Sequence, residues 1–144
     1  MVFSRVLTSD DYELLKTLLK NDEYHSDTSV DFFYEEGTAC NVYCDEKGPI
    51  LFLRGSSVLC NGIGFIQLDI QFIKNEDTKR NMKAMIEGFP ELENRAKENG
   101  FSGFFFVSTV PRLRRFCIKY LGFSELSENL LGKVLVGKAQ EEMV

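Results

Sequence analysis

The stretch Phe65-Ile66-Gln67-Leu68-Asp69-Ile70-Gln71-Phe72-Ile73 decides the fold that we expect. Bulky apolar and polar residues alternate over its middle, as they do in a strand that buries one face. The segment Asn75-Glu76-Asp77-Thr78 follows and is typical of a helix start, because such side chains accept hydrogen bonds from the first main-chain N–H groups. The stretch therefore predicts a strand that leads directly into a helix.

The sequence downstream predicts a second strand and a second helix. The helix that starts near Thr78 has an apolar stripe that runs from Met82 to Phe89. We expect Gly88 and Pro90 to kink or interrupt this helix before it ends at Gly100. Phe101 to Thr109 contains an unbroken apolar run, which is typical of a strand covered on both faces. A helix from Pro111 to Gly122 follows, with proline in its first turn.

Segments on either side complete the domain. We expect an opening strand, a leucine-rich helix, a weaker helix, a hairpin and a final strand, at Val2–Leu7, Thr8–Asp22, Ser26–Glu36, Ala39–Asp45 with Ile50–Arg54, and Leu130–Val136. We expect the last residues, Ala139 to Val144, to fray. The fold class is α/β in the α+β sense: one domain over residues 1–144, with a central, mostly antiparallel mixed sheet flanked by helices.

Composition limits the function. The 144 residues are 44% hydrophobic and 27% charged, as in soluble globular proteins. A net charge of -5 argues against general nucleic-acid binding, which needs a broad cationic surface. No apolar run approaches the ~20 residues that span a bilayer, so we expect no membrane insertion and a cytoplasmic protein.

Cysteine and histidine usage argues against a metal site. The four cysteines form no Cys-x-x-Cys pair, and His25 is the single histidine. We interpret the cysteines, Cys117 included, as reduced and buried, and His25 as an uncommitted surface residue in a loop. Gly62-Ile63-Gly64 precedes a strand and not a helix, so we interpret it as a turn.

Two short sequence segments resemble those of a known family. Thr8-Ser9-Asp10-Asp11-Tyr12 opens the first helix, and Arg115-Phe116-Cys117-Ile118-Lys119-Tyr120-Leu121-Gly122-Phe123 ends the last one. With the order of elements, they resemble the GNAT superfamily of N-acetyltransferases over nearly the whole chain. The resemblance implies a site for acetyl-CoA, with an Arg/Gln-x-x-Gly-x-Gly/Ala turn whose main-chain N–H groups hold the diphosphate.

This chain departs from that turn. Asp77 stands at the position of the first basic or amide residue, Arg80 at the first glycine and Met82 at the final small residue. An acidic group repels an anion, and each lost main-chain hydrogen bond costs ~1–3 kcal/mol. We therefore expect no cofactor. If acetyl-CoA binds, the resemblance assigns it to Ile70, Phe72, Lys79, Arg80 and Asn81.

The catalytic groups implied by the resemblance are few. Asp69, a strand carboxylate, takes the place of the general base. Ile118 stands where the family often has a tyrosine that acts as general acid. Arg112, Arg114 and Arg115 crowd a helix start, where cations are unfavourable unless they meet an anion or a partner. Two interpretations stay open: the three arginines form a surface that binds another protein, or their stems cover the sheet edge while their charges pair with nearby Glu residues.

Two functions follow. The first is a noncatalytic protein-interaction protein with an eroded cofactor turn, similar to GNAT-like proteins of short-tailed bacteriophages, which implies a virion or host-interaction role and a place in the virion or host cytoplasm. The alternative is an active acetyl-CoA-dependent N-acetyltransferase that acts on an amine of a small molecule or protein.

Overall fold

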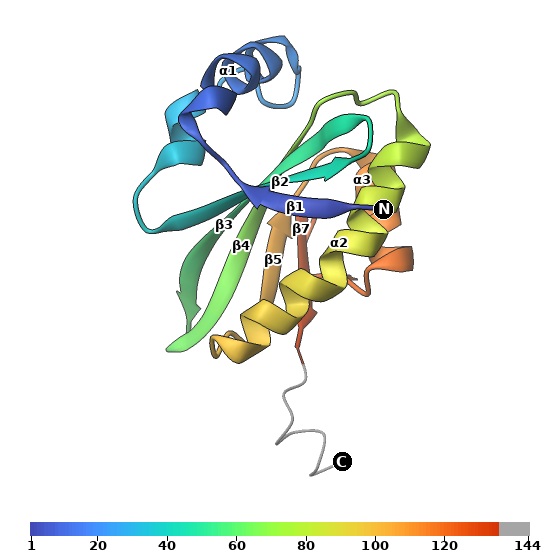
Figure 1. The fold of residues 1–144 in the computed structure, drawn as a ribbon. Coiled ribbons are helices and arrows are strands. Elements are labelled where there is room, and N and C mark those ends of the chain that lie inside the picture. Colours follow the sequence, from blue (N-terminus) through green and yellow to red (C-terminus); the bar gives the residue numbers. More distant parts are fainter. Residues whose placement is uncertain (136–144) are drawn as a thin grey trace. The chain divides into compact units, whose positions relative to one another are not determined.

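Seven strands form a mixed sheet flanked by helices, in a computed structural model that describes residues 1–135 (Figure 1). The strands are β1 (Phe3–Val6), β2 (Thr38–Asp45), β3 (Gly48–Cys60), β4 (Ile63–Phe72), β5 (Gly103–Val107), β6 (Ser124–Glu125) and β7 (Leu130–Val134). The helices are the 3₁₀ segments η1 (Ser9–Asp11) and η2 (Val30–Tyr34), and α1 (Tyr12–Asn21), α2 (Thr78–Glu98) and α3 (Pro111–Tyr120).

The sheet has the strand order β1-β2-β3-β4-β5-β7-β6. β4 pairs with β5 in parallel, with Ile66 opposite Phe104, whereas β1 with β2, β5 with β7 and β6 with β7 are antiparallel. The predicted fold class, a mostly antiparallel mixed sheet flanked by helices, is thus confirmed. The chain divides into two compact units, residues 1–55 with 69–88 and residues 56–68 with those from 89 onward. The assignment of one domain over residues 1–144 stays a prediction.

The first unit has an aliphatic and aromatic core. Leu15 and Leu19 lie four residues apart in α1, so they share one face of the helix, and both are buried. They belong to one cluster with Phe33 of η2, Val42 of β2 and Phe52 of β3. This packing holds η2 and the loop after α1 over the strands that carry the candidate site.

The second unit has an aromatic core. Phe89 of α2 stands 5.3 Å from Phe104 of β5 and 5.7 Å from Phe123, measured between ring centroids. The opposite face of β5 is more open: Phe105 stacks on Phe65 at 4.7 Å, and Val107 is 55% exposed. The expectation that this strand is covered on both faces is therefore wrong, because α2 contacts the face that carries Phe104 while Val107 on the other face stays exposed.

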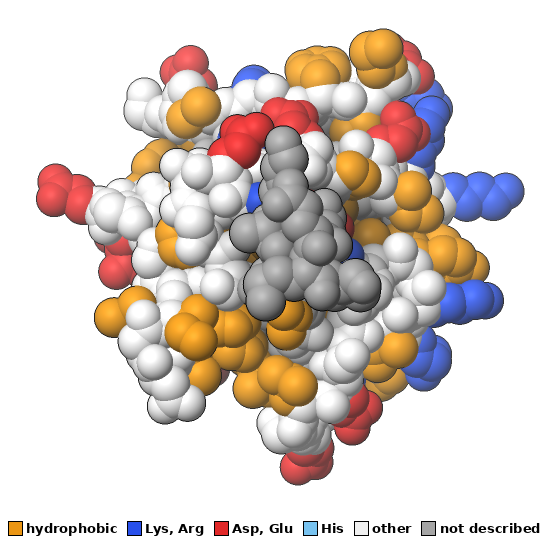
Figure 2. All heavy atoms as spheres, turned by 90° about the horizontal axis from the view of Figure 1, so that it is seen from below, with side chains coloured by type: hydrophobic (Ala, Val, Ile, Leu, Met, Phe, Trp, Pro, Cys, Tyr) orange, Lys and Arg blue, Asp and Glu red, His pale blue; other side chains and the backbone are white. Residues whose placement is uncertain are grey.

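Some hydrophobic side chains remain at the surface of the second unit. They include Leu59, Ile63 and Val134. Figure 2 shows hydrophobic side chains gathered in groups on the face that it views, among polar ones. None of the helices in residues 1–135 is long and apolar enough to cross a bilayer.

Three elements differ from the sequence prediction. α2 continues through Gly88 and Pro90 without interruption, because buried residues on both sides of the proline, Met85 and Ala96, favour the helical path over the one lost hydrogen bond. The helix expected at Ser26–Glu36 is only the short η2, since its aromatic and β-branched residues have weak helix propensity. The strand expected at Ile50–Arg54 is longer, because β3 runs from Gly48 to Cys60 before a turn at Asn61 and Gly62 with positive φ angles.

The C-terminal expectations are covered only in part. β7 ends at Val134, and the predicted strand end at Val136 lies outside the described residues. The expected fraying of Ala139 to Val144 lies outside them too.

Gly88 offers a test of the packing of α2 in the first unit. A Cβ at this position would lie 2.5 Å from Cε1 and 2.8 Å from Cδ1 of buried Tyr43. We expect Gly88→Ala to lower the free energy of unfolding by about 1–3 kcal/mol, although alanine normally stabilises a helix. Urea denaturation measures this, with the exposed Asn94→Ala as the control, for which we expect a change within about 0.5 kcal/mol. A stabilised Gly88→Ala variant would contradict the contact.

The cysteines offer a second test. Cys40, Cys44 and Cys117 are buried as expected, but Cys60 is exposed at the end of β3, so the expectation is wrong for that residue. Burial raises the pKa of Cys40 and of Cys117 to about 12. We expect a thiol reagent at pH 8 to modify Cys60 alone in the folded protein and the other three only after denaturation. Mass spectrometry after brief alkylation identifies the site, and Cys60→Ser is the control that should abolish the fast phase. Fast labelling of Cys40, Cys44 or Cys117 in that variant would contradict their burial.

Candidate active site

Asp69 faces a buried guanidinium. Asp69 lies on β4, and its Oδ2 stands 3.4 Å from Nη1 of Arg54 on the neighbouring strand β3. The side chain of Arg54 is only 6% exposed, and that of Asp69 is partly buried. Burial raises the pKa of Asp69 above its usual value, while the positive charges of Arg54 and His25 act in the opposite direction. The site thus holds a carboxylate that resists ionisation more than a surface aspartate does.

Arg54 also joins η2 to the sheet through hydrogen bonds. Its Nε donates to the main-chain oxygen of Phe32 at 2.7 Å, and its Nη2 donates to Oε1 of Glu35 at 2.8 Å. The guanidinium carbon stands 3.7 Å above the Phe32 ring, in cation–π geometry. Each nitrogen of the guanidinium therefore has an acceptor, which offsets the cost of its burial.

Gln71 forms a second polar cluster two residues along β4, on the same face as Asp69. It is 1% exposed, and its Nε2 donates to Oδ2 of Asp22 at 3.0 Å and to the main-chain oxygen of Phe72 at 2.9 Å. Its Oε1 lies 2.6 Å from Nδ1 of His25. The loop after α1 is therefore bound to β4 through buried polar groups.

His25 is not the uncommitted surface residue that the sequence suggested. Its side chain is 34% exposed, and Nδ1 also lies 3.7 Å from Oδ2 of Asp22. The interpretation was wrong because the partner, Gln71, is 46 positions away in the chain. The one signal in the sequence was the pair of polar residues, Asp69 and Gln71, on one face of a strand next to bulky apolar neighbours.

Arg80 is held by the turn between β2 and β3. Its Nε donates to Oδ2 of Asp45 at 2.8 Å, and its Nη2 donates to Oδ1 at 2.6 Å and to the main-chain oxygen of Gly48 at 2.9 Å. Asn81 is buried and donates from Nδ2 to the main-chain oxygen of Lys74 at 2.8 Å. Both side chains thus have structural partners, and their assignment to a cofactor stays a prediction.

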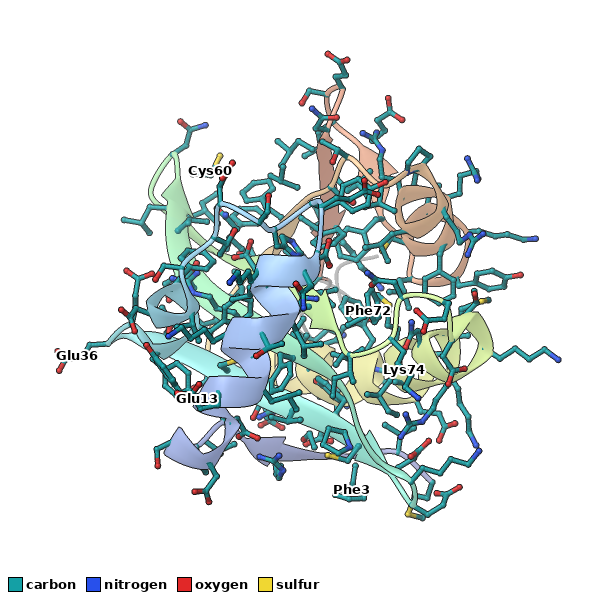
Figure 3. All side chains as sticks on the ribbon, turned by 90° about the horizontal axis from the view of Figure 1, so that it is seen from above. Phe3, Glu13, Glu36, Cys60, Phe72 and Lys74 are labelled. Atoms are coloured by element: carbon teal, nitrogen blue, oxygen red, sulfur yellow. The ribbon has the colours of Figure 1, made fainter. Side chains whose placement is uncertain are left out.

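The main chain at the start of α2 offers two donors. The N–H of Asp77 and that of Thr78 bond to Lys74 and Glu76 within the turn, whereas those of Lys79 and Arg80 have no acceptor among the described residues. The side chains of Lys74 and Lys79 are exposed, and Figure 3 shows Phe72 and Lys74 on the segment that enters α2. Two N–H groups and two lysines at a helix start fit an anionic group, and Asp77 opposes it.

The other predicted cofactor residues lie beside this turn. Ile70 is buried on β4, and Phe72, the last residue of that strand, is half-buried. Together with Lys79, Arg80 and Asn81 they form one continuous segment of the first unit. Their role stays a prediction.

The three arginines of α3 differ from one another. Arg114 is paired within the second unit: its Nη2 lies 3.1 Å from Oε2 of Glu125, and its Nη1 donates to the main-chain oxygen of Glu128. Arg112 and Arg115 are exposed. Their assignment to a protein partner stays a prediction. Among residues 1–135, no group of three or more His, Cys, Asp or Glu side chains is placed to hold a metal ion.

Comparisons with known proteins identify the fold. No family model and no curated protein matches the chain. Solved structures do: a GNAT-family acetyltransferase from Staphylococcus aureus Mu50 (12% identity, 94% of this chain, 99% of that chain, TM-score 0.70), an aminoglycoside N(6')acetyltransferase from Legionella pneumophila (10%, 99%, 96%, 0.70) and AtaTR bound with AcCoA (15%, 99%, 97%, 0.66). The chain has the fold of the GNAT N-acetyltransferases, as the resemblance implied.

Asp45 and Arg80 predict a pH-dependent contribution to stability. Hydrogen bonds from Arg80 hold the pKa of Asp45 well below its usual value. A carboxylate whose pKa is lowered by folding stabilises the protein above its unfolded pKa of about 3.9, and this stabilisation is lost as the pH falls through the folded value. We expect Asp45→Asn to lower the urea midpoint at pH 7, and we expect the difference from the wild type to shrink progressively below about pH 4.

The control is Glu46→Gln, because Glu46 is a neighbouring exposed carboxylate whose ion pair, with the N-terminal amine, is exposed as well. We expect no clear change from it. If Asp45→Asn destabilised the protein equally at pH 7 and pH 2, the ion pair would not be the cause.

Proposed function

We propose that this protein is an acetyl-CoA-dependent N-acetyltransferase that acts on an amine. The observation that carries the proposal is the position of Asp69, a partly buried carboxylate with a raised pKa on the strand that leads to a helix start with two free N–H groups. The acetyltransferase fold supports the same function by analogy. AtaTR, which has this fold, was solved with AcCoA bound.

Different groups of the first unit would hold different parts of acetyl-CoA. The N–H groups of Lys79 and Arg80, with the side chains of Lys74 and Lys79, would hold the diphosphate, and the main chain of Ile70 and Phe72 would hold the acyl end. When bound, acetyl-CoA would supply an acetyl thioester. The side chain of Arg80 stays on Asp45 in this arrangement, so only its main chain contacts the ligand.

Asp69 provides the negative charge that an amine substrate needs. An amine in water is mostly protonated and has no free electron pair for attack, so the site must first attract an ammonium group and then accept one of its protons. The carboxylate of Asp69, whose pKa is raised by burial, would attract the ammonium group. Arg54 keeps the carboxylate in place through the 3.4 Å contact.

A second candidate is the noncatalytic one, in which the cofactor turn is degenerate. The observation that favours it is the turn without glycine, where the side chains of Arg80 and Asn81 are already bound to Asp45 and Lys74. Exposed Arg112 and Arg115 would then bind an acidic surface of another protein. A phage origin, a virion or host-interaction role and a cytoplasmic place belong to this second proposal.

Binding and turnover test the two functions together. We expect calorimetry to show that acetyl-CoA and free CoA both bind, and a thiol-release assay with mixed amines to show turnover. Asp69→Asn should lower kcat by about 10²–10⁴-fold, because it removes the negative charge that draws the ammonium group into the proton-transfer site while keeping the shape.

Asp77→Asn is the matched variant, since it removes the carboxylate beside the proposed diphosphate position. We expect it to tighten CoA binding by roughly 2–5-fold, which corresponds to ~0.3–1 kcal/mol at a helix start. Absence of CoA binding in both proteins, with a specific protein co-purifying, would favour the noncatalytic function instead.

A further inference from the structure

The hydrogen bonds of Gln71 determine which ring nitrogen of His25 has the proton. The amide of Gln71 lies against two groups that can only accept at this distance, the carboxylate of Asp22 at 3.0 Å and the main-chain oxygen of Phe72 at 2.9 Å. The NH₂ end must therefore point to them. A flipped amide would set its oxygen against two other oxygens in a buried place, which is strongly unfavourable.

The oxygen of the same amide then faces His25. An amide oxygen only accepts hydrogen bonds, so Nδ1 of His25, 2.6 Å away, must have a hydrogen and donate it. In the neutral ring the proton consequently resides on Nδ1, and Nε2 has a free electron pair. This is the opposite of the tautomer that imidazole rings favour when nothing orients them.

Nε2 is available to a substrate. His25 makes no contact through Nε2 with any of the residues that the structure describes, and one third of its side chain is exposed. The charged groups near the ring are Asp22, whose Oδ2 lies 3.7 Å from Nδ1, and Asp69 of β4, which is paired with Arg54 and interacts electrostatically with the ring.

We propose that His25 is the proton acceptor of the acetyl transfer, and that Asp22 and Gln71 are positioning residues that hold its Nε2 electron pair toward the substrate amine. This proposal rests on the proposed function and names the atom that performs its first step. Asp69 keeps the role of the charge partner that attracts the ammonium group, because its Oδ2 is already directed at Arg54, whereas Nε2 of His25 has no partner among residues 1–135.

The step is an acid–base exchange that balances by itself. The N–H bond of a substrate ammonium group breaks, the proton forms a new bond to Nε2 of His25, and the amine keeps the electron pair. The products are a neutral amine, ready to attack a thioester, and an imidazolium flanked by Asp22 and Asp69. Imidazoles suit this exchange because they titrate between about pH 5 and 8.

The chain has one histidine, so its ring signals in a nuclear magnetic resonance spectrum need no further assignment. We expect long-range ¹H–¹⁵N correlations at pH 8.5 to show the hydrogen on Nδ1 in the wild type. Gln71→Met removes the acceptor, and we expect its ring to shift toward the Nε2–H form. Gln67→Met is the control. It makes the same change on the same face of β4, nearer the start of the strand, and should leave the tautomer unchanged.

Kinetics test the catalytic role. We expect His25→Gln to lower kcat/KM by about 10²–10⁴-fold and to abolish the rise of kcat/KM between pH 5 and 8. Added imidazole should restore part of the rate in His25→Gln but not in Asp69→Asn, because only the first variant lacks the proton acceptor. A purely structural role of His25 would give no such rescue.

The outcomes separate the two proposals. A wild-type enzyme that turns over, with His25→Gln equally active or the wild-type hydrogen found on Nε2, would overturn the role of His25 and leave the acetyltransferase function standing. A wild type that binds no CoA and releases no thiol would overturn the acetyltransferase function itself.

Discussion

The buried guanidinium of Arg54 is the constraint on which the first unit depends. A charge with 6% exposure is tolerated only when every donor is satisfied, and removal of one partner of such a buried pair typically costs about 3–5 kcal/mol. Its acceptors come from η2, from the residue after η2 and from β4, so one side chain of β3 joins η2 to two neighbouring strands. The position of Asp69 is a consequence of this requirement.

Polar groups that are covered by other segments also lie on one face of β4. Asp69 and Gln71 stand two residues apart and point the same way, toward the segment from Asp22 to Glu35. Covering these groups lowers the local dielectric, which strengthens every charge interaction among them and makes an unpaired group costly. A polar cluster of this kind is therefore fixed in its orientation and sensitive to single changes.

The local patterns of the sequence were sufficient for the elements but not for the site. Alternation in residues 65–73 predicts β4, and the polar run after Ile73 predicts the start of α2, because both signals lie within a few residues. The pairs that build the site join residues 15 to 49 positions apart, such as Arg54 with Asp69 and Asp22 with Gln71. No periodicity encodes such a contact. For the same reason His25 looked free, and the course of α2 through Pro90 depended on burial that the sequence alone does not display.

The turn at the start of α2 shows where the side chain that replaces a glycine is placed. Glycine is needed where a Cβ would stand between the main chain and the ligand. Here the side chain of Arg80 leaves the helix start toward Asp45 and the oxygen of Gly48, and there it joins α2 to the β2–β3 turn. The bulk at this position thus contributes to packing, while the main-chain N–H of Arg80 has no acceptor among residues 1–135. The charge of Asp77, more than the bulk of Arg80, is then the feature that weakens the attraction of this turn for an anion.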